Sequence, residues 1–104
     1  MENRREERVY GLKNLIIRSE DKEFSAVMTS ISKTGVSVII DTVLPTYKEI
    51  LMDFEIENNK INVKGSVRWV NDHMAEPGSN LKEIGILFLN PPDNFIEYLD
   101  KILK

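Results

Sequence analysis

The clearest strand pattern in the chain is ILMDFEIENNKINVKGSVRW, residues 50–69. Apolar residues alternate with mostly polar ones in both halves of this stretch. The apolar positions are Ile50, Met52, Phe54 and Ile56 in the first half and Ile61, Val63, Val67 and Trp69 in the second. A period of two is typical of a strand with one buried face. Between the two runs, Asn58-Asn59-Lys60 supplies residues that tolerate a tight turn. We therefore predict a β-hairpin.

Two features of this hairpin lead to further expectations. Gly65 interrupts an otherwise regular strand, which indicates a bulge or a sharp bend that lets a small sheet curl. Trp69, like Phe54 and Phe88, alternates with polar residues, and we interpret all three aromatic side chains as core.

Four further segments are rich in Val, Ile, Phe or Thr and are predicted as strands: 10–18, 24–31, 36–41 and 83–89. Six strands in a chain of this size favour a closed barrel, because closure removes exposed edges. After Asn90-Pro91-Pro92 the apolar spacing becomes helical, at Phe95, Ile96, Leu99, Ile102 and Leu103. Asn94 and Glu97 are placed to form a capping box. The apolar stripe of this helix must cover either the mouth of the barrel or a partner subunit.

Composition limits the class of protein. A chain of 104 residues has room for one domain, with an arm at 1–8, a barrel at 9–90 and a helix at 91–104. Its net charge of −3 disfavours a nucleic-acid polymer as partner. The absence of cysteine excludes disulfides and fits a cytoplasmic location. No apolar run resembles a signal peptide or a membrane span, so we expect no membrane insertion.

The residues needed for catalysis are sparse. The single histidine, His73, follows Asp72 in a polar loop, and no second histidine could complete a triad or a metal site. Asp53, Glu55 and Glu57 are expected on the solvated face of a strand. No glycine-rich phosphate loop occurs. We therefore expect neither an enzyme nor a bound metal or cofactor.

Arginines are unevenly distributed. Three of the five, Arg4, Arg5 and Arg8, lie just before the first predicted strand. Alone, such a segment is most often a charged tail. A guanidinium, however, also presents a planar fork that can bind a phosphate, pair with a guanine edge or stack on a purine.

A second polar segment, Ser30-Ile31-Ser32-Lys33-Thr34-Gly35, separates the second and third predicted strands. It reads as a hairpin turn in which hydroxyl groups bond to nearby backbone and Gly35 accepts a positive φ. Alternatively, its small hydroxyls and backbone N–H groups could form a second wall for a phosphate-bearing ligand.

The two segments together resemble the PilZ domain family over essentially the whole chain. Arg4 and Arg8, with Arg5 between them, match its RxxxR motif, and Ser32 and Gly35 match its [D/N]xSxxG motif. The runs at 35–38, 63–70 and 84–88 also resemble strands of the family. The resemblance implies a mainly all-β fold, a six-stranded antiparallel β-barrel with a C-terminal helix, that binds the second messenger cyclic di-GMP.

The resemblance also implies roles for single residues. Arg4 and Arg8 would contact guanine edges, guanine faces or phosphates, with Arg5 assisting. Ser32 would hydrogen-bond the ligand, and Gly35 would keep the turn close to it. Ser30 stands where the family has Asp or Asn, so it retains a hydroxyl but has less reach, and we expect reduced affinity.

Three functions remain open at this point. The chain could be a bacterial cyclic di-GMP receptor that passes its signal to an effector protein, alone or as a homodimer. It could instead be a PilZ-like interaction domain that binds no nucleotide and docks on motility or polysaccharide machinery, which Ser30 favours. A barrel for single-stranded nucleic acid would need exposed aromatic platforms on a basic face, which the core assignment of the aromatic residues disfavours.

Overall fold

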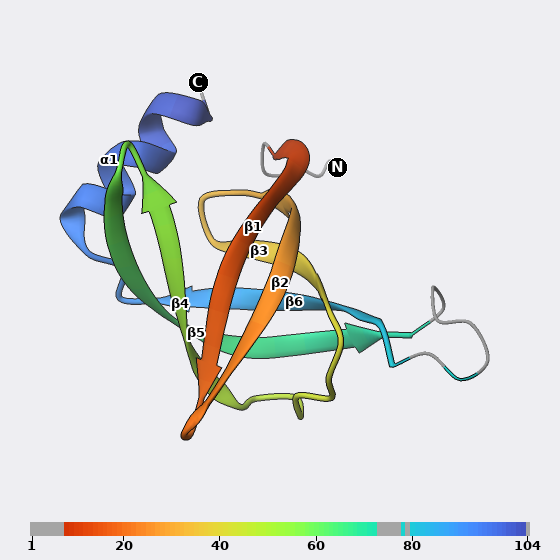
Figure 1. Cartoon of the computed structure of the whole chain (residues 1–104). Coiled ribbons are helices and arrows are strands. Elements are labelled where there is room, and N and C mark those ends of the chain that lie inside the picture. Colours follow the sequence, from red (N-terminus) through yellow and green to blue (C-terminus); the bar gives the residue numbers. More distant parts are fainter. Residues whose placement is uncertain (1–7, 73–77, 79, 104) are drawn as a thin grey trace.

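Six strands close into a barrel, and one helix follows them (Figure 1). The computed structural model describes residues 8–72, 78 and 80–103. Its elements are β1 (Val9–Ser19), β2 (Lys22–Ile31), β3 (Gly35–Ile40), β4 (Glu49–Ile56), β5 (Asn59–Asn71), β6 (Lys82–Leu89) and α1 (Asp93–Ile102). Every strand pair is antiparallel, and the order around the barrel is β1-β2-β3-β6-β5-β4. The expected fold class and all six expected strands are confirmed.

The β4–β5 hairpin forms in the register that its alternation demands. Phe54 lies opposite Ile61, and Ile50 opposite Gly65, so the apolar positions share the inner face. The turn is made by Glu57 and Asn58, whose φ angles are +52° and +69°. A two-residue hairpin turn of this kind needs positive φ at both positions, which asparagine tolerates well. The turn therefore begins one residue earlier than the expected Asn58-Asn59-Lys60.

Gly65 does not form the bulge that we expected. It is paired in regular register with Ile50 on one side and Phe88 on the other. Its missing side chain serves the packing of the core, because a Cβ there would lie 2.4 Å from Ile86 Cγ2 and 2.8 Å from Met52 Cε.

The bulge of β5 lies at Arg68 instead, and it changes the environment of Trp69. Val67 pairs with Ile86 and Trp69 with Gly85, so Arg68 is the extra residue. One inserted residue reverses the side to which the following side chains point. Trp69 is consequently 45% exposed, and its assignment to the core was wrong. Phe54 and Phe88 are buried, as expected.

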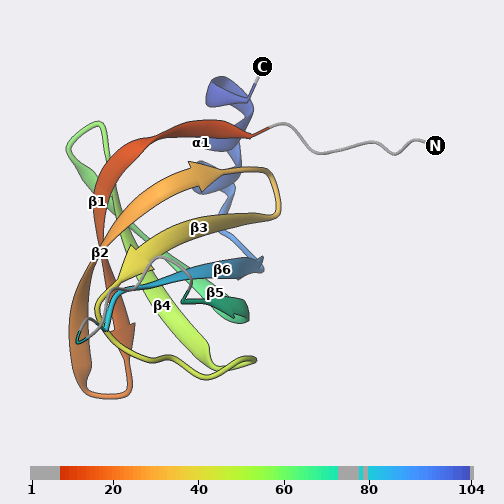
Figure 2. The ribbon, with the colours of Figure 1, turned by 90° about the vertical axis from the view of Figure 1, so that its right-hand side faces the viewer.

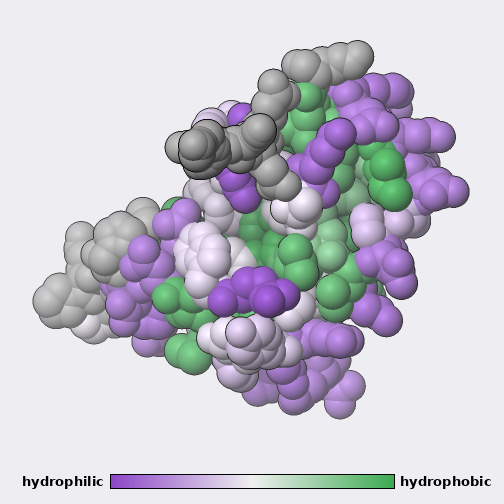
Figure 3. Space-filling model, turned by 180° about the vertical axis from the view of Figure 1, so that it is seen from behind, coloured by the Kyte–Doolittle hydropathy of each residue, from purple (hydrophilic) through white to green (hydrophobic). Residues whose placement is uncertain are grey.

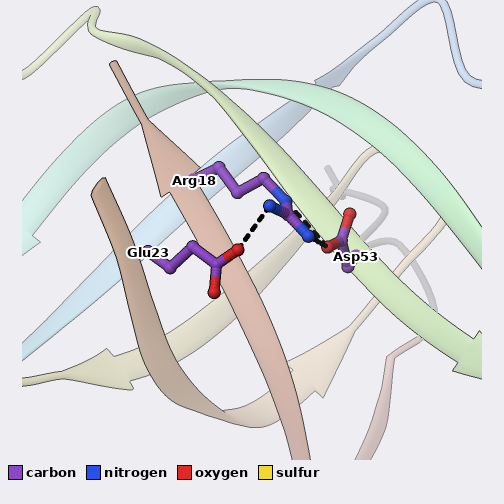
Figure 4. A network of polar contacts seen from close by, with 3 residues as sticks. All are labelled: Arg18, Glu23 and Asp53. Atoms are coloured by element: carbon purple, nitrogen blue, oxygen red, sulfur yellow. Dashed lines mark hydrogen bonds and ion pairs between the residues drawn. The ribbon is translucent and has the colours of Figure 1, made fainter. Parts of the chain in front are cut away.

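The barrel closes through a short ladder between β1 and β4. Only three residue pairs form it, from Ile16–Asp53 to Arg18–Leu51. Arg18 reinforces this seam by donating from Nε (2.9 Å) and Nη2 (2.6 Å) to Asp53 Oδ2, and it also contacts Glu23 on β2 (Figure 4). The hydrogen bond to Asp53 raises the pKa of Arg18 above its ordinary value. Asp53 points outward from its strand, yet it is buried beneath this contact.

Helix α1 covers the mouth of its own barrel. The ring of Phe95 is fully buried, with its centroid 4.8 Å from that of Phe54 and 5.1 Å from that of Phe88. Leu99 and Leu103 continue the buried stripe. Of the two surfaces that this stripe could cover, the structure therefore selects the barrel.

The expected capping box is absent from the start of α1. Pro92 is the N-cap residue, and its carbonyl accepts the N–H groups of Phe95 (3.0 Å) and Ile96 (3.1 Å) without any side-chain cap. Asn94 lies inside the first turn, because the helix begins at Asp93. From that position its side chain cannot serve as the cap that the Asn94–Glu97 spacing indicated.

Within the described part of the chain, no helix is long and apolar enough to cross a membrane. Nor do the acidic side chains described there gather into a group that could hold a metal ion.

Candidate functional site

The first strand brings the end of the arginine segment beside the end of β2. Val9 pairs with Ile31 and Tyr10 with Ser30, and Figure 2 shows the start of β1 next to the β2–β3 turn. Arg8 directly precedes this pairing, and its Nη1 donates a hydrogen bond of 2.8 Å to Ser30 Oγ. Two of the predicted site residues are thus in direct contact.

Two other predicted site residues, Arg4 and Arg5, lie outside the described residues, as does His73.

Ser30 is a buried, neutral anchor for Arg8. Its Oγ lies 2.9 Å from Ser37 Oγ on β3, the residue directly opposite it in the sheet. Both serines are more than nine-tenths buried. Because this anchor is a hydroxyl and not a carboxylate, it orients the guanidinium of Arg8 without neutralising its charge. That charge remains available to an anionic ligand.

Ser32 shapes the β2–β3 turn from within. It is fully buried, and its hydroxyl accepts hydrogen bonds of 3.3 Å from the backbone N–H groups of Thr34 and Gly35. The same hydroxyl donates to the carbonyl of Gly35 at 3.3 Å. In this structure Ser32 therefore supports the turn, and a direct contact between its hydroxyl and a ligand stays a prediction.

Gly35 is required by a close approach of two strands, and not by the positive φ that we expected. Its φ is not in the left-handed region. A Cβ on Gly35 would lie 2.4 Å from the carbonyl oxygen of Ile86 on β6. Only glycine allows β3 to begin so close to β6, because the backbone of Ile86 occupies the space that a Cβ would need.

A hollow of about 160 Å³ lies beside Gly35, where β3 and β6 approach each other. It is lined by Arg8, Thr34, Gly35, Val36, Arg68, Trp69, Gly85, Ile86 and Leu87. Figure 3 views the molecule from behind, the side on which β3 and β6 lie in Figure 1, and shows a hydrophobic centre bordered by hydrophilic surface. Two larger hollows, at the α1–hairpin junction and between β1 and β4, contain none of the predicted site residues. The small hollow is therefore the candidate site.

Reasoning from the sequence missed three residues of this site: Arg68, Trp69 and Gly85. The Arg68 guanidinium carbon lies 5.1 Å from the centroid of the Tyr47 ring, a cation–π geometry that holds it at the rim. Tyr47 is itself tied to β5 by its N–H, which donates to the carbonyl of Val67 at 2.5 Å. The sequence Val67-Arg68-Trp69 has no turn or glycine signal that would reveal the bulge.

The lining determines which ligands the hollow can take. It presents two guanidinium groups and an indole, with no carboxylate among the lining residues. Guanidinium groups favour phosphates and the acceptor edge of guanine, and an exposed indole favours the face of an aromatic base. A protein cavity of about 150 Å³ takes one benzene-sized ring. The hollow therefore has the volume of about one aromatic ring and is much smaller than a whole dinucleotide.

Comparison with known proteins agrees with this fold. A structure of the Bacillus subtilis inhibitor of motility (MotI/DgrA) superposes with a TM-score of 0.75 at 15% sequence identity. The match covers 95% of this chain and 48% of that one, so the chain spans about half the length of its structural neighbour. No curated protein sequence matches the chain. The family model of the PilZ domain matches residues 2–104, nearly the full length. The chain therefore belongs to the PilZ domain family.

Proposed function

We propose that this PilZ domain binds cyclic di-GMP over the hollow between the start of β1, the β2–β3 turn and the bulge of β5. One observation carries the proposal: Arg8, Gly35, Arg68 and Trp69 come from three separate parts of the chain and line the same hollow. Family membership supports the choice of ligand, because PilZ domains act as receptors and adaptors for this messenger. No catalytic step is proposed.

The proposed mode of binding assigns one task to each group. The indole of Trp69 stacks on one guanine, while Arg8 pairs with a guanine edge or a phosphate. Because Ser30 already holds Arg8 in place, less side-chain entropy is lost when the ligand binds. The rest of the dinucleotide extends beyond the hollow, where Arg4 and Arg5 are proposed to contact it.

Isothermal titration with cyclic di-GMP tests the proposal. Arg8→Ala should weaken binding about tenfold or more, the value of one good bidentate guanine contact. Lys22→Ala is the matched control: it removes an exposed cation next to the β1–β2 turn, at the opposite end of the barrel, and should leave affinity unchanged (Figure 2). Native protein that shows no binding at tens of micromolar would contradict the proposal.

Ser30 favours a second function, an interaction domain that does not bind the nucleotide. The buried hydroxyl of Ser30 gives Arg8 a weaker partner than the family Asp or Asn would. If ligand binding is retained, Ser30→Asn should strengthen it several-fold, since the longer amide can hold Arg8 and also reach the ligand. Ser25→Asn, at an exposed position of the same strand, is the control. An unchanged affinity in Ser30→Asn would mean that the missing family residue is unimportant here.

The third function, binding of single-stranded nucleic acid, requires exposed aromatic side chains. We had assigned Trp69 to the core, but it is exposed and so meets this requirement. Phe54 and Phe88 stay buried, however, so only one of the three aromatic residues is available for stacking. Such proteins present a series of aromatic platforms along a basic groove. The net charge of −3 disfavours such a basic groove and favours a small ligand.

We further propose that cyclic di-GMP draws the arginine segment, residues 4–8, across the barrel and so changes the surface offered to an effector protein. The structural neighbour is named as an inhibitor of motility, which makes motility machinery a reasonable place to look for that effector. Tryptic cleavage after Arg5 should slow when cyclic di-GMP is added. Equal cleavage rates with and without ligand would argue against this coupling.

A further inference from the structure

Trp69 and Gly85 fit together across the β5–β6 ladder. The bulge at Arg68 places Trp69 opposite Gly85 in the sheet. A Cβ at position 85 would lie 2.2 Å from both Cε2 and Nε1 of the indole and 2.7 Å from Cζ2. The indole thus occupies the space that a side chain at position 85 would need. The bulge places the indole opposite position 85, and the glycine at that position leaves room for it.

We propose that Gly85 is a positioning residue, which holds the indole of Trp69 against β6 as a preformed platform for a purine base. This inference rests on the proposed function and adds a specificity-determining residue outside both arginine and serine motifs. Gly85 is buried while Trp69 remains 45% exposed, so the indole is supported on the side of β6 and still accessible to solvent. A supported ring loses little freedom when a base stacks on it.

Any side chain at position 85 would displace this platform. To reach an ordinary contact distance of 3.4 Å from a new Cβ, the indole would have to move by about 1 Å or more. The displaced ring would either enter the hollow of about 160 Å³ or swing away from it. Both movements remove a stacking surface aligned with Arg8 and Gly35. Because the obstructing group is an exposed side chain that can rotate, the barrel itself should still fold.

A double-mutant cycle tests whether Gly85 acts through Trp69. Dissociation constants for cyclic di-GMP would be measured for the native protein, Gly85→Ala, Trp69→Ala and the double variant. Gly85→Ala alone should weaken binding about tenfold, the scale of one lost base stack. In the Trp69→Ala background the same change should have no further effect, because the group it displaces is gone. Equal weakening in both backgrounds would overturn the inference.

Fluorescence tests the contact without any ligand, because Trp69 is the single tryptophan of the chain. Gly85→Ala should change the quenching of its emission by acrylamide, which rises if the ring swings away from the barrel and falls if the ring enters the hollow. Lys22→Ala is the control, because Lys22 is exposed at the start of β2, away from the indole, and its truncation should leave the quenching unchanged. Unchanged quenching in Gly85→Ala would overturn the positioning role even if the native protein binds cyclic di-GMP. If the native protein does not bind, the proposed function and the platform role both fail, while quenching still decides whether Gly85 holds the ring.

Discussion

At Gly35 the backbone of a neighbouring strand leaves no room for a side chain. The conflict in Gly35→Ala is with a carbonyl oxygen of β6, which cannot rotate away. We expect this variant to lose about 1–3 kcal/mol of unfolding free energy, as overpacked sites do, measured by urea denaturation. Gly85→Ala should lose less, because the conflict there is with a movable indole. Equal losses in the two variants would contradict the distinction between rigid and movable neighbours.

Glu20 carries a pH-sensitive contact at the β1–β2 turn. The pKa of Glu20 is lowered below its ordinary value, mainly by the hydrogen bond that Lys48 donates to it and secondly by the positive charge of Lys48. A carboxyl whose pKa is lowered by folding adds stability above its unfolded pKa, and this contribution is lost as the pH falls through the folded pKa. The contact therefore stabilises the fold at neutral pH and stops doing so in acid.

Lys48→Met should return the pKa of Glu20 toward its ordinary value, as followed by NMR titration of its side chain. The stability difference between native protein and Lys48→Met should be small, because the pair is exposed, and should disappear at low pH. Lys60→Met, at the other end of the β4–β5 hairpin, should leave the titration of Glu20 unchanged. A Glu20 titration that does not move in Lys48→Met would show that the lysine is not the cause.

Among the elements, helix α1 packs its buried face into the mouth of the barrel and completes the core. Phe95 is enclosed by Phe54 and Phe88, so its truncation would open a cavity at the mouth of the barrel. We expect Phe95→Ala to lower the free energy of unfolding by about 3–5 kcal/mol in urea denaturation. Ile96→Ala, at the next residue and 41% exposed, should cost far less. Similar costs for both would show that the helix packs only loosely on the barrel.

Strand β5 shows how one inserted residue can shape a candidate site. Up to Val67 its apolar residues are buried, whereas Arg68, Trp69 and Val70 at and beyond the bulge are all exposed. The bulge thus exposes an aromatic side chain and places a second guanidinium beside it at the rim of the hollow. A regular strand would have buried Trp69 and left the hollow without a stacking surface.

For the whole molecule, the weakest point of closure is the three-pair ladder between β1 and β4. Arg18 spans this seam, and Asp53 Oδ2 accepts both of its hydrogen bonds. Arg18→Met would leave a buried carboxylate without its cation, which is costlier than removing both charges. We expect the urea midpoint to fall further in Arg18→Met than in the double variant Arg18→Met/Asp53→Asn.

The exposed partner Glu23 provides the control for that comparison. Glu23→Gln removes a charge at the outer side of Arg18 and should change the midpoint little, as exposed ion pairs usually do. A double variant less stable than Arg18→Met would mean that Asp53 stabilises the seam without needing its partner's charge.

Local patterns were enough to predict the elements. Apolar alternation, strand-favouring composition and helical spacing depend only on near neighbours in the chain, and together they correctly predicted six strands, the β4–β5 hairpin and the C-terminal helix. The two motifs likewise pointed to Arg8, Ser30 and Gly35, which the structure brings to one surface. Fold class and family were therefore readable from the sequence.

Predictions failed where the outcome depended on a neighbouring strand or on the place where an element begins. A bulge or sharp bend was expected at Gly65, whereas the bulge lies at Arg68, because strand pairing with β6 decides which residue is extra. We expected Gly35 to have a positive φ, whereas glycine is required there because a Cβ would collide with a carbonyl oxygen of β6. The capping box failed because α1 begins at Asp93, directly after Pro92.

Short-range periodicity in the sequence was sufficient to predict the strands and the helix, and the arginine and serine motifs carried the resemblance to the family. Three other features became apparent only in three dimensions: α1 closes its own barrel, Ser30 holds Arg8, and Trp69 lies outside the core over Gly85. Each of these joins residues that are far apart in the chain. Such contacts depend on register and closure, which a one-dimensional pattern does not encode.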